Sequence, residues 1–196
     1  GTGAAPGWTS EVGSWGQVGD GTYGDVSTTT TGVIYESASY GSDYSDFTYE
    51  AALILGRTAE TGATNSLYVR GVPGPYVYSY KRWRSGIAFN VSGNGKYSIY
   101  RMTPTTNVAL QTWDFPSGTT LVADGTTENV LKVEATGGTL RFWINGVLDD
   151  AVEGQAELSG KVGVGMVSPS HPPVIALMAC NVARIRFSCA DFVSAG

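Results

Sequence analysis

The sequence predicts an all-β protein, folded as a two-sheet antiparallel β-sandwich. Its 196 residues include 27 glycines, 11% aromatic residues and only 15% charged residues, a composition typical of all-β proteins. About a dozen short segments alternate apolar and polar residues, and none of the chain shows a long helical period. The even spacing, with no linker or repeat, indicates one domain over residues 14–196. Residues 1–13 form an N-terminal extension that should lie on the surface or add an edge strand.

The clearest strands lie in the segment 129–167. Its first two alternate apolar and polar residues on either side of Gly137-Gly138, which predicts a β-hairpin. Asn145-Gly146 supplies the positive-φ pair of a tight two-residue turn, so a third strand should follow. We read residues 148–158 as strand and loop rather than as a short helix, because a glycine interrupts them. Residues 161–167 are expected to form a fourth strand.

The rest of the chain shows the same pattern of strands and turns. Residues 14–24 predict a compact hairpin with aromatic anchors, and residues 41–45 predict a polar loop. Residues 71–84 contain two prolines and four aromatic residues, which favours a loop over a central strand. Further strands are expected at residues 33–37, 46–55, 66–70, 86–91, 96–101, 108–113 and 174–187.

Charge and cysteine content exclude several classes of function. The formal net charge is −5 and the sequence pI is about 4.8, so the chain lacks the basic surface that nucleic acid requires. No apolar run approaches the roughly 20 residues that span a bilayer, so we expect no membrane insertion. Cys180 and Cys189 would lie roughly 30 Å apart on a straight strand, too far for a disulfide, and they read as buried thiols.

A series of segments, in order along the chain, carries a resemblance to a known superfamily. The segments are Trp15 to Tyr23, Asp-Phe-Thr-Tyr-Glu at 46–50, Gly-Ile-Ala-Phe-Asn-Val at 86–91, Gly-Lys-Tyr-Ser-Ile-Tyr-Arg at 95–101, Asn-Val-Leu-Lys-Val at 129–133, Leu-Arg-Phe-Trp-Ile-Asn-Gly at 140–146 and Gly-Lys-Val-Gly-Val at 160–164. Together they resemble the concanavalin A-like lectin/glucanase jelly roll, and within it the laminin G-like and 3-keto-disaccharide hydrolase-like domains of bacterial secreted proteins. The resemblance covers nearly all of the chain from Trp15 to Phe187. It implies a secreted or cell-surface jelly roll, but its members include sugar-binding modules, glycanases, lyases and adhesion domains.

Candidate ligand-binding residues are aromatic and polar side chains that point away from the expected core. Sugars present apolar C–H faces, so their sites combine Trp or Tyr rings with a few hydrogen-bonding groups. On the strands, the outward-facing candidates for the curved face of the sandwich are Asn90, Tyr100, Arg141 and Trp143. In the loops and at a strand end, the candidates for the rim of that face are Tyr76, Tyr78, Tyr80, Trp83 and Trp113. The alternative for each ring is that it packs between sheet and loop.

A metal and a catalytic site are weaker expectations. The superfamily often holds calcium through Asp, Asn and backbone oxygens, and four aspartates lie in glycine-rich loops: Asp20, Asp25, Asp43 and Asp124. The pair Cys180-Asn181 stands where the resemblance implies Asp-Asn. The glucanases of the superfamily carry a Glu-x-Asp-x-x-Glu cluster on one strand, which this sequence lacks. Asp46 and Glu50 would lie about 13 Å apart on a regular strand, too far for the paired carboxylates of a glycosidase.

These observations favour a non-catalytic, lectin-like module that binds an oligosaccharide or polysaccharide. We expect it to be secreted or held at the cell surface, beside other domains of a larger protein. Two alternatives stay open: a divergent glycan-active hydrolase of the same superfamily, and a structural or adhesive domain that recognises protein. Calcium is a possible cofactor.

Overall fold

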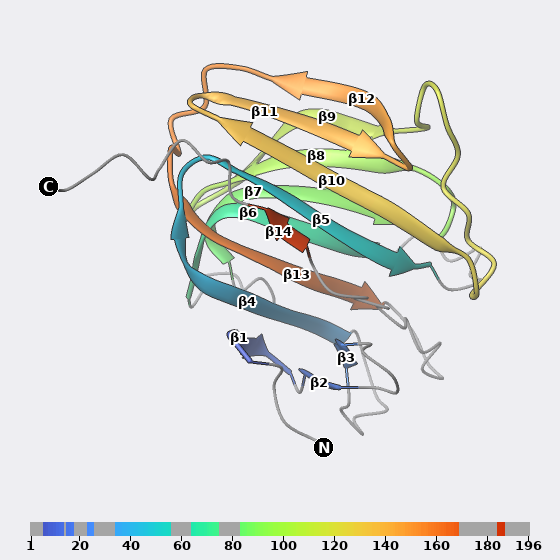
Figure 1. The fold of residues 1–196 in the computed structure, drawn as a ribbon, viewed down its shortest axis with the longest axis horizontal. Coiled ribbons are helices and arrows are strands. Elements are labelled where there is room, and N and C mark those ends of the chain that lie inside the picture. Colours follow the sequence, from blue (N-terminus) through green and yellow to red (C-terminus); the bar gives the residue numbers. More distant parts are fainter. Residues whose placement is uncertain are drawn as a thin grey trace, which may run out of the picture.

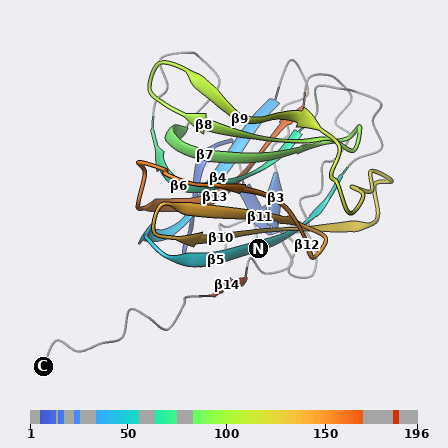
Figure 2. The same ribbon diagram turned by 90° about the horizontal axis from the view of Figure 1, so that it is seen from above.

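The computed structural model describes residues 6–13, 15–17, 23–25, 34–55, 64–74, 83–168 and 184–186. Their regular structure is antiparallel β-strand, arranged as two large sheets and one two-stranded sheet (Figure 1). In this part of the chain, no helix is long and apolar enough to cross a membrane. The two large sheets pack face to face, with β7, β8 and β9 in one layer and β5, β10 and β11 in the other (Figure 2).

The first large sheet has seven strands in the order β1-β4-β13-β6-β7-β8-β9. They are β1 (Trp8–Val12), β4 (Ile34–Tyr44), β13 (Gly160–Ser168), β6 (Thr64–Pro73), β7 (Trp83–Ser92), β8 (Tyr97–Met102) and β9 (Asn107–Asp114). The N-terminal extension adds β1 at one edge of this sheet, where it pairs with β4. β9 forms the opposite edge.

The second large sheet has five strands in the order β12-β11-β10-β5-β14. They are β12 (Val147–Val152), β11 (Thr139–Ile144), β10 (Glu128–Thr136), β5 (Phe47–Ile54) and β14 (Arg184–Arg186). The two-stranded sheet is the predicted N-terminal hairpin of β2 (Trp15–Gln17) and β3 (Tyr23–Asp25).

The core lies between the two large sheets and follows the period-2 pattern of the sequence. Along β5 every second side chain is buried, beginning with Phe47 and Tyr49. Phe142 of β11 meets Phe89 of β7 edge-on, with ring centroids 5.2 Å apart, so the sheets interlock at this point. The Tyr49 hydroxyl donates a hydrogen bond of 3.2 Å to the Gly163 carbonyl of the opposite sheet. One core therefore joins both layers, as a β-sandwich requires.

The hairpins of the segment 129–167 form as predicted. Asn145 and Gly146 adopt φ values of 49° and 82°, the two positive values of a tight hairpin turn. The Asn145 amide donates to the Thr120 carbonyl at 2.8 Å, and its oxygen accepts from the Val130 N–H at 2.8 Å. After β12 the chain forms a loop, and β13 crosses to the other sheet, where it pairs with β4 and β6.

Several strands are longer than the local sequence predicts, β4 and β6 most of all. β7 also begins at Trp83, inside residues 71–84, which we expected to form a loop. β4 continues through residues 41–44, which we expected to be a polar loop, because Gly160 of β13 pairs with Tyr44. β6 extends beyond the predicted residues 66–70 on both sides, because β13 and β7 flank it and bond its backbone. Pairing with strands that are distant in the sequence satisfies the backbone hydrogen bonds of these polar segments. Local residue propensity does not predict such pairing.

Part of the predicted C-terminal strand lies outside the described residues. Of residues 174–187, only the backbone of β14 is described, and it pairs with β5. Cys180 and Cys189 also fall outside the described part of the chain. The expectation of unpaired thiols therefore stays a prediction.

Candidate functional site

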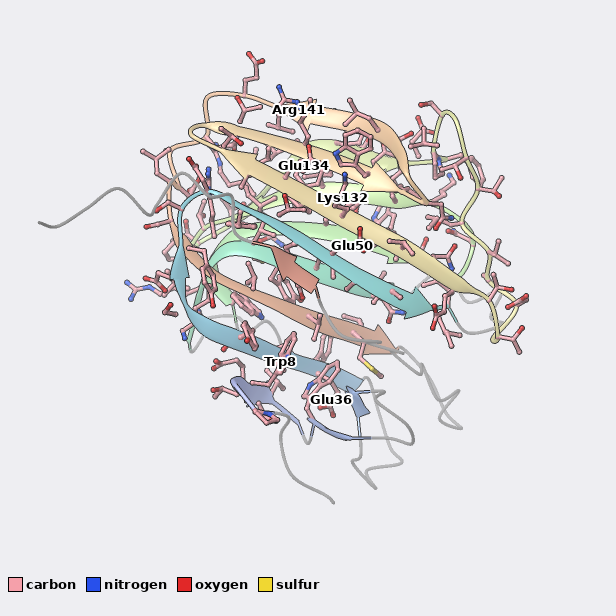
Figure 3. The ribbon with its side chains drawn as sticks, in the orientation of Figure 1. Trp8, Glu36, Glu50, Lys132, Glu134 and Arg141 are labelled. Carbon is pink, nitrogen blue, oxygen red and sulfur yellow. The ribbon has the colours of Figure 1, made fainter. Side chains whose placement is uncertain are left out.

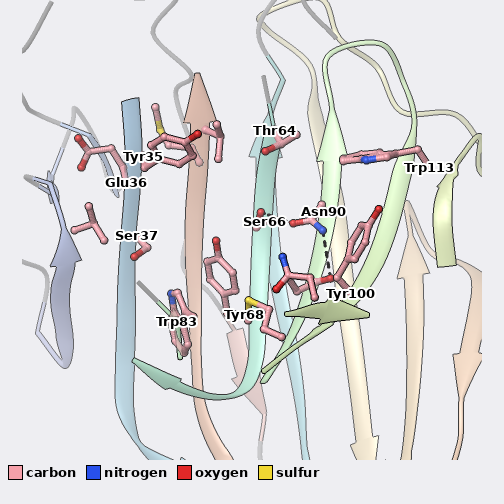
Figure 4. A pocket seen from close by; sticks show the side chains of 16 residues that line it. Tyr35, Glu36, Ser37, Thr64, Ser66, Tyr68, Trp83, Asn90, Tyr100 and Trp113 are labelled. Atoms are coloured by element: carbon pink, nitrogen blue, oxygen red, sulfur yellow. Dashed lines mark hydrogen bonds between the residues drawn. The ribbon is translucent and has the colours of Figure 1, made fainter. Parts of the chain in front are cut away.

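The outer face of the seven-stranded sheet carries a groove of about 340 Å³. It arises from alternation along each strand, since Ile87 and Phe89 of β7 face the core whereas Ala88 and Asn90 line the groove. Every strand of this sheet contributes at least one lining residue, so the groove runs across the sheet toward its edge at β9 (Figure 4). A site of this kind exists only once all these strands have assembled.

Ser66 and Asn90 line the floor of the groove, and they belong to a hydrogen-bonded row of short polar side chains that continues to Ser98. The Ser66 hydroxyl donates to the Asn90 side-chain oxygen at 2.7 Å. The Asn90 amide nitrogen donates to the Ser98 hydroxyl at 3.3 Å and to the Ala88 carbonyl at 3.4 Å. Because β6, β7 and β8 are neighbours, these three side chains lie side by side. The row fixes the orientation of the Asn90 amide before any ligand arrives.

One wall of the groove is a stacked pair of aromatic rings. Tyr68 and Trp83 have ring centroids 4.7 Å apart and planes inclined by 20°. Trp83 is only 1% exposed, so it is a buried wall rather than the exposed rim residue that the sequence suggested. The rings fit because β13 offers no side chain beneath them. A Cβ on Gly163 would lie 2.4 Å from the Trp83 ring, and one on Gly165 would lie 2.6 Å from the Tyr68 ring.

Tyr100 of β8 and Trp113 of β9 line the groove on the side of the β9 edge. Tyr100 is half-buried, whereas Trp113 is 38% exposed. Figure 4 shows both rings beside Asn90, across the groove from Tyr35 of β4. Partly exposed rings of this kind can stack against the apolar face of a ligand.

Three buried polar atoms of residues that line the groove have no hydrogen-bond partner within the described part of the chain. They are the Ser37 hydroxyl oxygen on β4, the Trp83 indole nitrogen on β7 and the Asn107 side-chain oxygen on β9. Buried polar groups in proteins are nearly always paired, so each of these atoms is available to a bound molecule or to water.

The described lining of the groove carries little charge. Among the described residues that line it, Glu36 is the one charged side chain. Burial raises the pKa of the Tyr68 phenol, and its side-chain hydrogen bond with Ser66 partly opposes that shift. Tyr68 therefore stays uncharged at neutral pH and acts as a hydroxyl group.

The structure brings together some of the predicted binding residues and separates others. Asn90, Tyr100, Trp83 and Trp113 all line the groove. Three further candidates, Tyr76, Tyr78 and Tyr80, lie outside the described residues. The expectation that a single curved face carries all of the strand candidates is wrong, because Arg141 and Trp143 belong to β11 of the other sheet.

Arg141 and Trp143 lie on the outer face of the five-stranded sheet. Arg141 is exposed, as Figure 3 shows together with Lys132 and Glu134 of the neighbouring strand β10. The Lys132 ammonium lies 4.0 Å from the centre of the Trp143 ring and forms a 2.7 Å ion pair with Glu134. The Trp143 ring is thus already covered by a cation. A ligand-binding role for Arg141 and Trp143 stays a prediction.

The four aspartates considered for calcium do not form a described site. Asp20, and the side chain of Asp25, lie outside the described part of the chain, and Asp43 is exposed. Where side chains are described, no three His, Cys, Asp or Glu residues come together in a way that could hold a metal ion. Asp124 instead closes its own turn, accepting from the backbone N–H groups of Thr126 and Thr127 at 2.7 and 2.6 Å.

Asp124 makes the stability of this turn depend on pH. Hydrogen bonds from the Thr127 hydroxyl, the Thr127 N–H and the Thr126 N–H lower the pKa of Asp124 below its ordinary value. The stabilisation is therefore present above about pH 4, the value of the unfolded chain, and is lost as the pH falls through the lower folded-state value. We expect the urea midpoint to fall less between pH 6 and pH 2 in Asp124→Asn than in the wild type. Equal falls would contradict this role.

Sequence reasoning missed several residues of the groove. They are Tyr35, Ser37, Thr64, Ser66, Tyr68 and Asn107. The signal that could have indicated the site is the alternation of Gly163 and Gly165 with valines in β13, since a strand without side chains on its outer face leaves a hollow there.

Comparisons with known proteins match structures but not sequences. No protein-family model and no curated protein sequence matches the chain. The carbohydrate-binding module CBM66 from Bacillus subtilis aligns with a TM-score of 0.57 and 17% identity, over 84% of this chain and 92% of that one. The carbohydrate recognition domain of Emp46p in its potassium-bound form aligns with a TM-score of 0.56 and 11% identity, over 84% and 82%. A metal-free form of the same domain also matches.

An enzyme is also among the similar structures. The endo-β-galactosidase from Clostridium perfringens that releases GlcNAcα1-4Gal aligns with a TM-score of 0.57 and 12% identity, over 88% of this chain but only 56% of the enzyme. At such low identities the likeness concerns the fold, and it includes binding domains and a hydrolase alike. The two-sheet architecture and these matches confirm the fold that the sequence resembles. The chain shares the two-sheet antiparallel β-sandwich fold of these structures.

Proposed function

We propose that this chain is a non-catalytic module that binds glycan in the groove of the seven-stranded sheet. The observation that supports this function is the combination of aromatic walls with a preoriented floor of hydroxyl and amide groups. Sugar rings present apolar C–H faces and many hydroxyl groups, which such a groove complements. Two of the similar structures named above are carbohydrate-binding domains, which agrees with the proposal.

Binding without hydrolysis fits the acid content of the groove. Glycosidases generally use two carboxyl groups, about 5–5.5 Å apart in retaining enzymes and about 6.5–9.5 Å apart in inverting ones. Glu36 is the one carboxylic acid among the described residues that line the groove. The arrangement therefore supports recognition of a glycan rather than its cleavage.

We further infer that the module is secreted or displayed at the cell surface, beside other domains that act on or anchor to the same glycan. The low content of charged residues and the acidic pI agree with this location. Asp43 and Asp124 are not among the residues that line the groove, so binding should persist in the presence of a chelator if calcium acts through them.

Removing an exposed ring from the groove should abolish most of the binding. A panel of oligosaccharides and polysaccharides is screened first, with calcium and again with chelator, for retention without product release. We expect Tyr100→Ala and Trp113→Ala each to weaken binding of the best glycan about 10-fold or more, because each removes a stacking surface. Calorimetry measures the affinity, and circular dichroism checks that both variants stay folded.

Two further variants locate the site. Phe115→Ala removes a 61% exposed aromatic ring that does not line the groove, and its affinity should equal that of the wild type. Trp143→Ala tests the other sheet. Binding that survives Tyr100→Ala but fails in Trp143→Ala would move the site to the five-stranded sheet and overturn the proposal. Release of shortened glycan would instead favour a hydrolase, and a blank screen would favour an adhesive domain.

A further inference from the structure

The groove contains two buried polar groups that have no hydrogen-bond partner among the described residues. The two groups are the indole N–H of Trp83 and the hydroxyl of Ser37. Trp83 is 1% exposed and Ser37 is 4% exposed. Figure 4 shows the indole nitrogen and the Ser37 hydroxyl facing the same part of the groove. They come from β7 and β4, with β13 and β6 between these strands in the sheet. The pair is therefore built by tertiary structure.

Glycines allow the indole to reach across the intervening strands. A Cβ on Gly71 of β6 would lie 2.3 Å from the Trp83 ring, and one on Gly163 of β13 would lie 2.4 Å from it. Both distances are far shorter than a van der Waals contact, so only glycine leaves room for the ring. The space that these glycines provide carries the N–H group of Trp83 toward β4.

The chemistry of these groups selects the atom that can satisfy them. The indole N–H is a donor only, whereas the Ser37 hydroxyl both donates and accepts. A single hydroxyl oxygen can accept from Trp83 and exchange a hydrogen bond with Ser37. On the β9 side of the groove, the unpartnered Asn107 oxygen is an acceptor only, so it requires a donor on the ligand. Hydroxyl groups of a sugar meet both requirements.

The charge of the groove selects against acidic ligands. Glu36 is the one charged side chain among the described lining residues, and no described lysine or arginine lines the groove. Among the described lining residues, a carboxylate on the ligand would find no cationic partner in a partly desolvated space. Uncharged sugars avoid this cost.

We propose that the groove selects uncharged glycans over uronic acids and reads one of their hydroxyl oxygens through the paired Trp83 N–H and Ser37 hydroxyl. This inference rests on the proposed glycan-binding function and defines the class of ligand for the same site. Trp83 and Ser37 act in it as specificity-determining residues that contact the ligand.

The experiment compares matched ligands and conservative variants by calorimetry. The ligands are the best neutral oligosaccharide of the screen and the oligosaccharide of the corresponding uronic acid, with glucose and glucuronate tetrasaccharides or galactose and galacturonate tetrasaccharides as the probes. We expect the neutral member to bind at least 10-fold more tightly. Trp83→Phe, which keeps the ring, and Ser37→Ala should each weaken neutral binding about 10-fold, because each removes one hydrogen-bonding group.

Stability distinguishes recognition from a structural role. Ser37→Ala removes no hydrogen bond to a described residue, so it should not lower the melting temperature. Trp83→Phe also deletes buried ring atoms, so it should lower the melting temperature modestly while the variant stays folded by circular dichroism. Ser39→Ala is the matched control on the same face of β4, because the Ser39 hydroxyl is also buried but donates to the Glu11 carboxylate. It should lower the melting temperature and leave the affinity unchanged.

The outcomes separate this inference from the function on which it rests. If Tyr100→Ala abolishes binding but Trp83→Phe and Ser37→Ala retain full affinity, the groove binds glycan and water occupies the pair, which overturns the inference alone. Equal or tighter binding of the uronate probe overturns the ligand class. Absence of binding to every glycan overturns the proposed function and this inference with it.

Discussion

Replacing Arg70 by methionine is expected to lower the free energy of unfolding by about 3 kcal/mol. Arg70 is 1% exposed and lies at the irregular part of β6, with a φ of 48°. Its guanidinium donates to the Ser45 carbonyl at 2.8 and 3.1 Å and to the Glu157 carbonyl at 3.2 Å. Burial lowers the pKa of Arg70, and the nearby Asp46 carboxylate opposes that shift. Arg70 thus links two loops that connect the sheets, the β4–β5 turn at Ser45 and the β12–β13 loop at Glu157.

The loss follows from the carbonyl groups that the substitution leaves without a donor. A hydrogen bond from a charged group contributes about 1.5–3 kcal/mol, and Arg70→Met removes the bonds to two carbonyls, one of exposed Ser45 and one of half-buried Glu157. Asp46→Asn is the matched control: it removes the charge 3.6 Å from Arg70 but keeps an oxygen to accept from the Gly137 N–H. Because Asp46 is substantially exposed, that change should cost less than about 1 kcal/mol. Urea unfolding measures both, and equal losses would contradict this account.

Placing a methyl group on Gly163 is expected to damage both the core and the groove. In Gly163→Ala the new Cβ would lie 2.4 Å from the Trp83 ring and 2.5 Å from the backbone oxygen of Ala38. The ring could shift, but the backbone of the adjacent strand β4 could not do so cheaply. Overpacking of this kind costs about 1–3 kcal/mol, and we expect a loss near the upper limit.

Gly138→Ala is a matched control for this prediction. The closest atom to a Cβ on Gly138 would be the Gln155 carbonyl oxygen at 3.6 Å, an ordinary contact. Neither glycine has a positive φ, so the two substitutions differ in the space available. Gly138→Ala should leave the melting temperature and the glycan affinity nearly unchanged, whereas Gly163→Ala should lower both. Wild-type affinity in Gly163→Ala would show that the position of the Trp83 ring does not determine binding.

The predicted binding residues show which structural features the alternation of residues along a strand can predict. Alternation correctly placed Asn90, Tyr100, Arg141 and Trp143 on the outer side of their strands. In a sandwich each sheet has its own outer side, and a period of two residues does not state to which sheet a strand belongs. The pattern therefore placed on one surface residues that the structure divides between two faces.

Trp83 also shows that a local sequence pattern does not predict contacts between distant segments. Trp83 reads in the sequence as part of an aromatic loop, yet it begins β7 and is buried against Tyr68. Its burial depends on Gly71 and Gly163, which are separated from it and from each other along the chain. No single window of sequence contains these contacts, so pattern analysis had no means to detect them.

The sequence by itself determined the strands, their tight turns and the division of each strand into a core side and an outer side. Local chemistry suffices for this, because side chains alternate along a strand and Asn145-Gly146 favours the positive φ values of its turn. The tertiary structure alone decided that β13 inserts between β4 and β6, and which outer side is hollow. Strand order depends on pairing between segments far apart in the chain. The groove and its unpartnered Trp83 and Ser37 groups exist only after that pairing is complete.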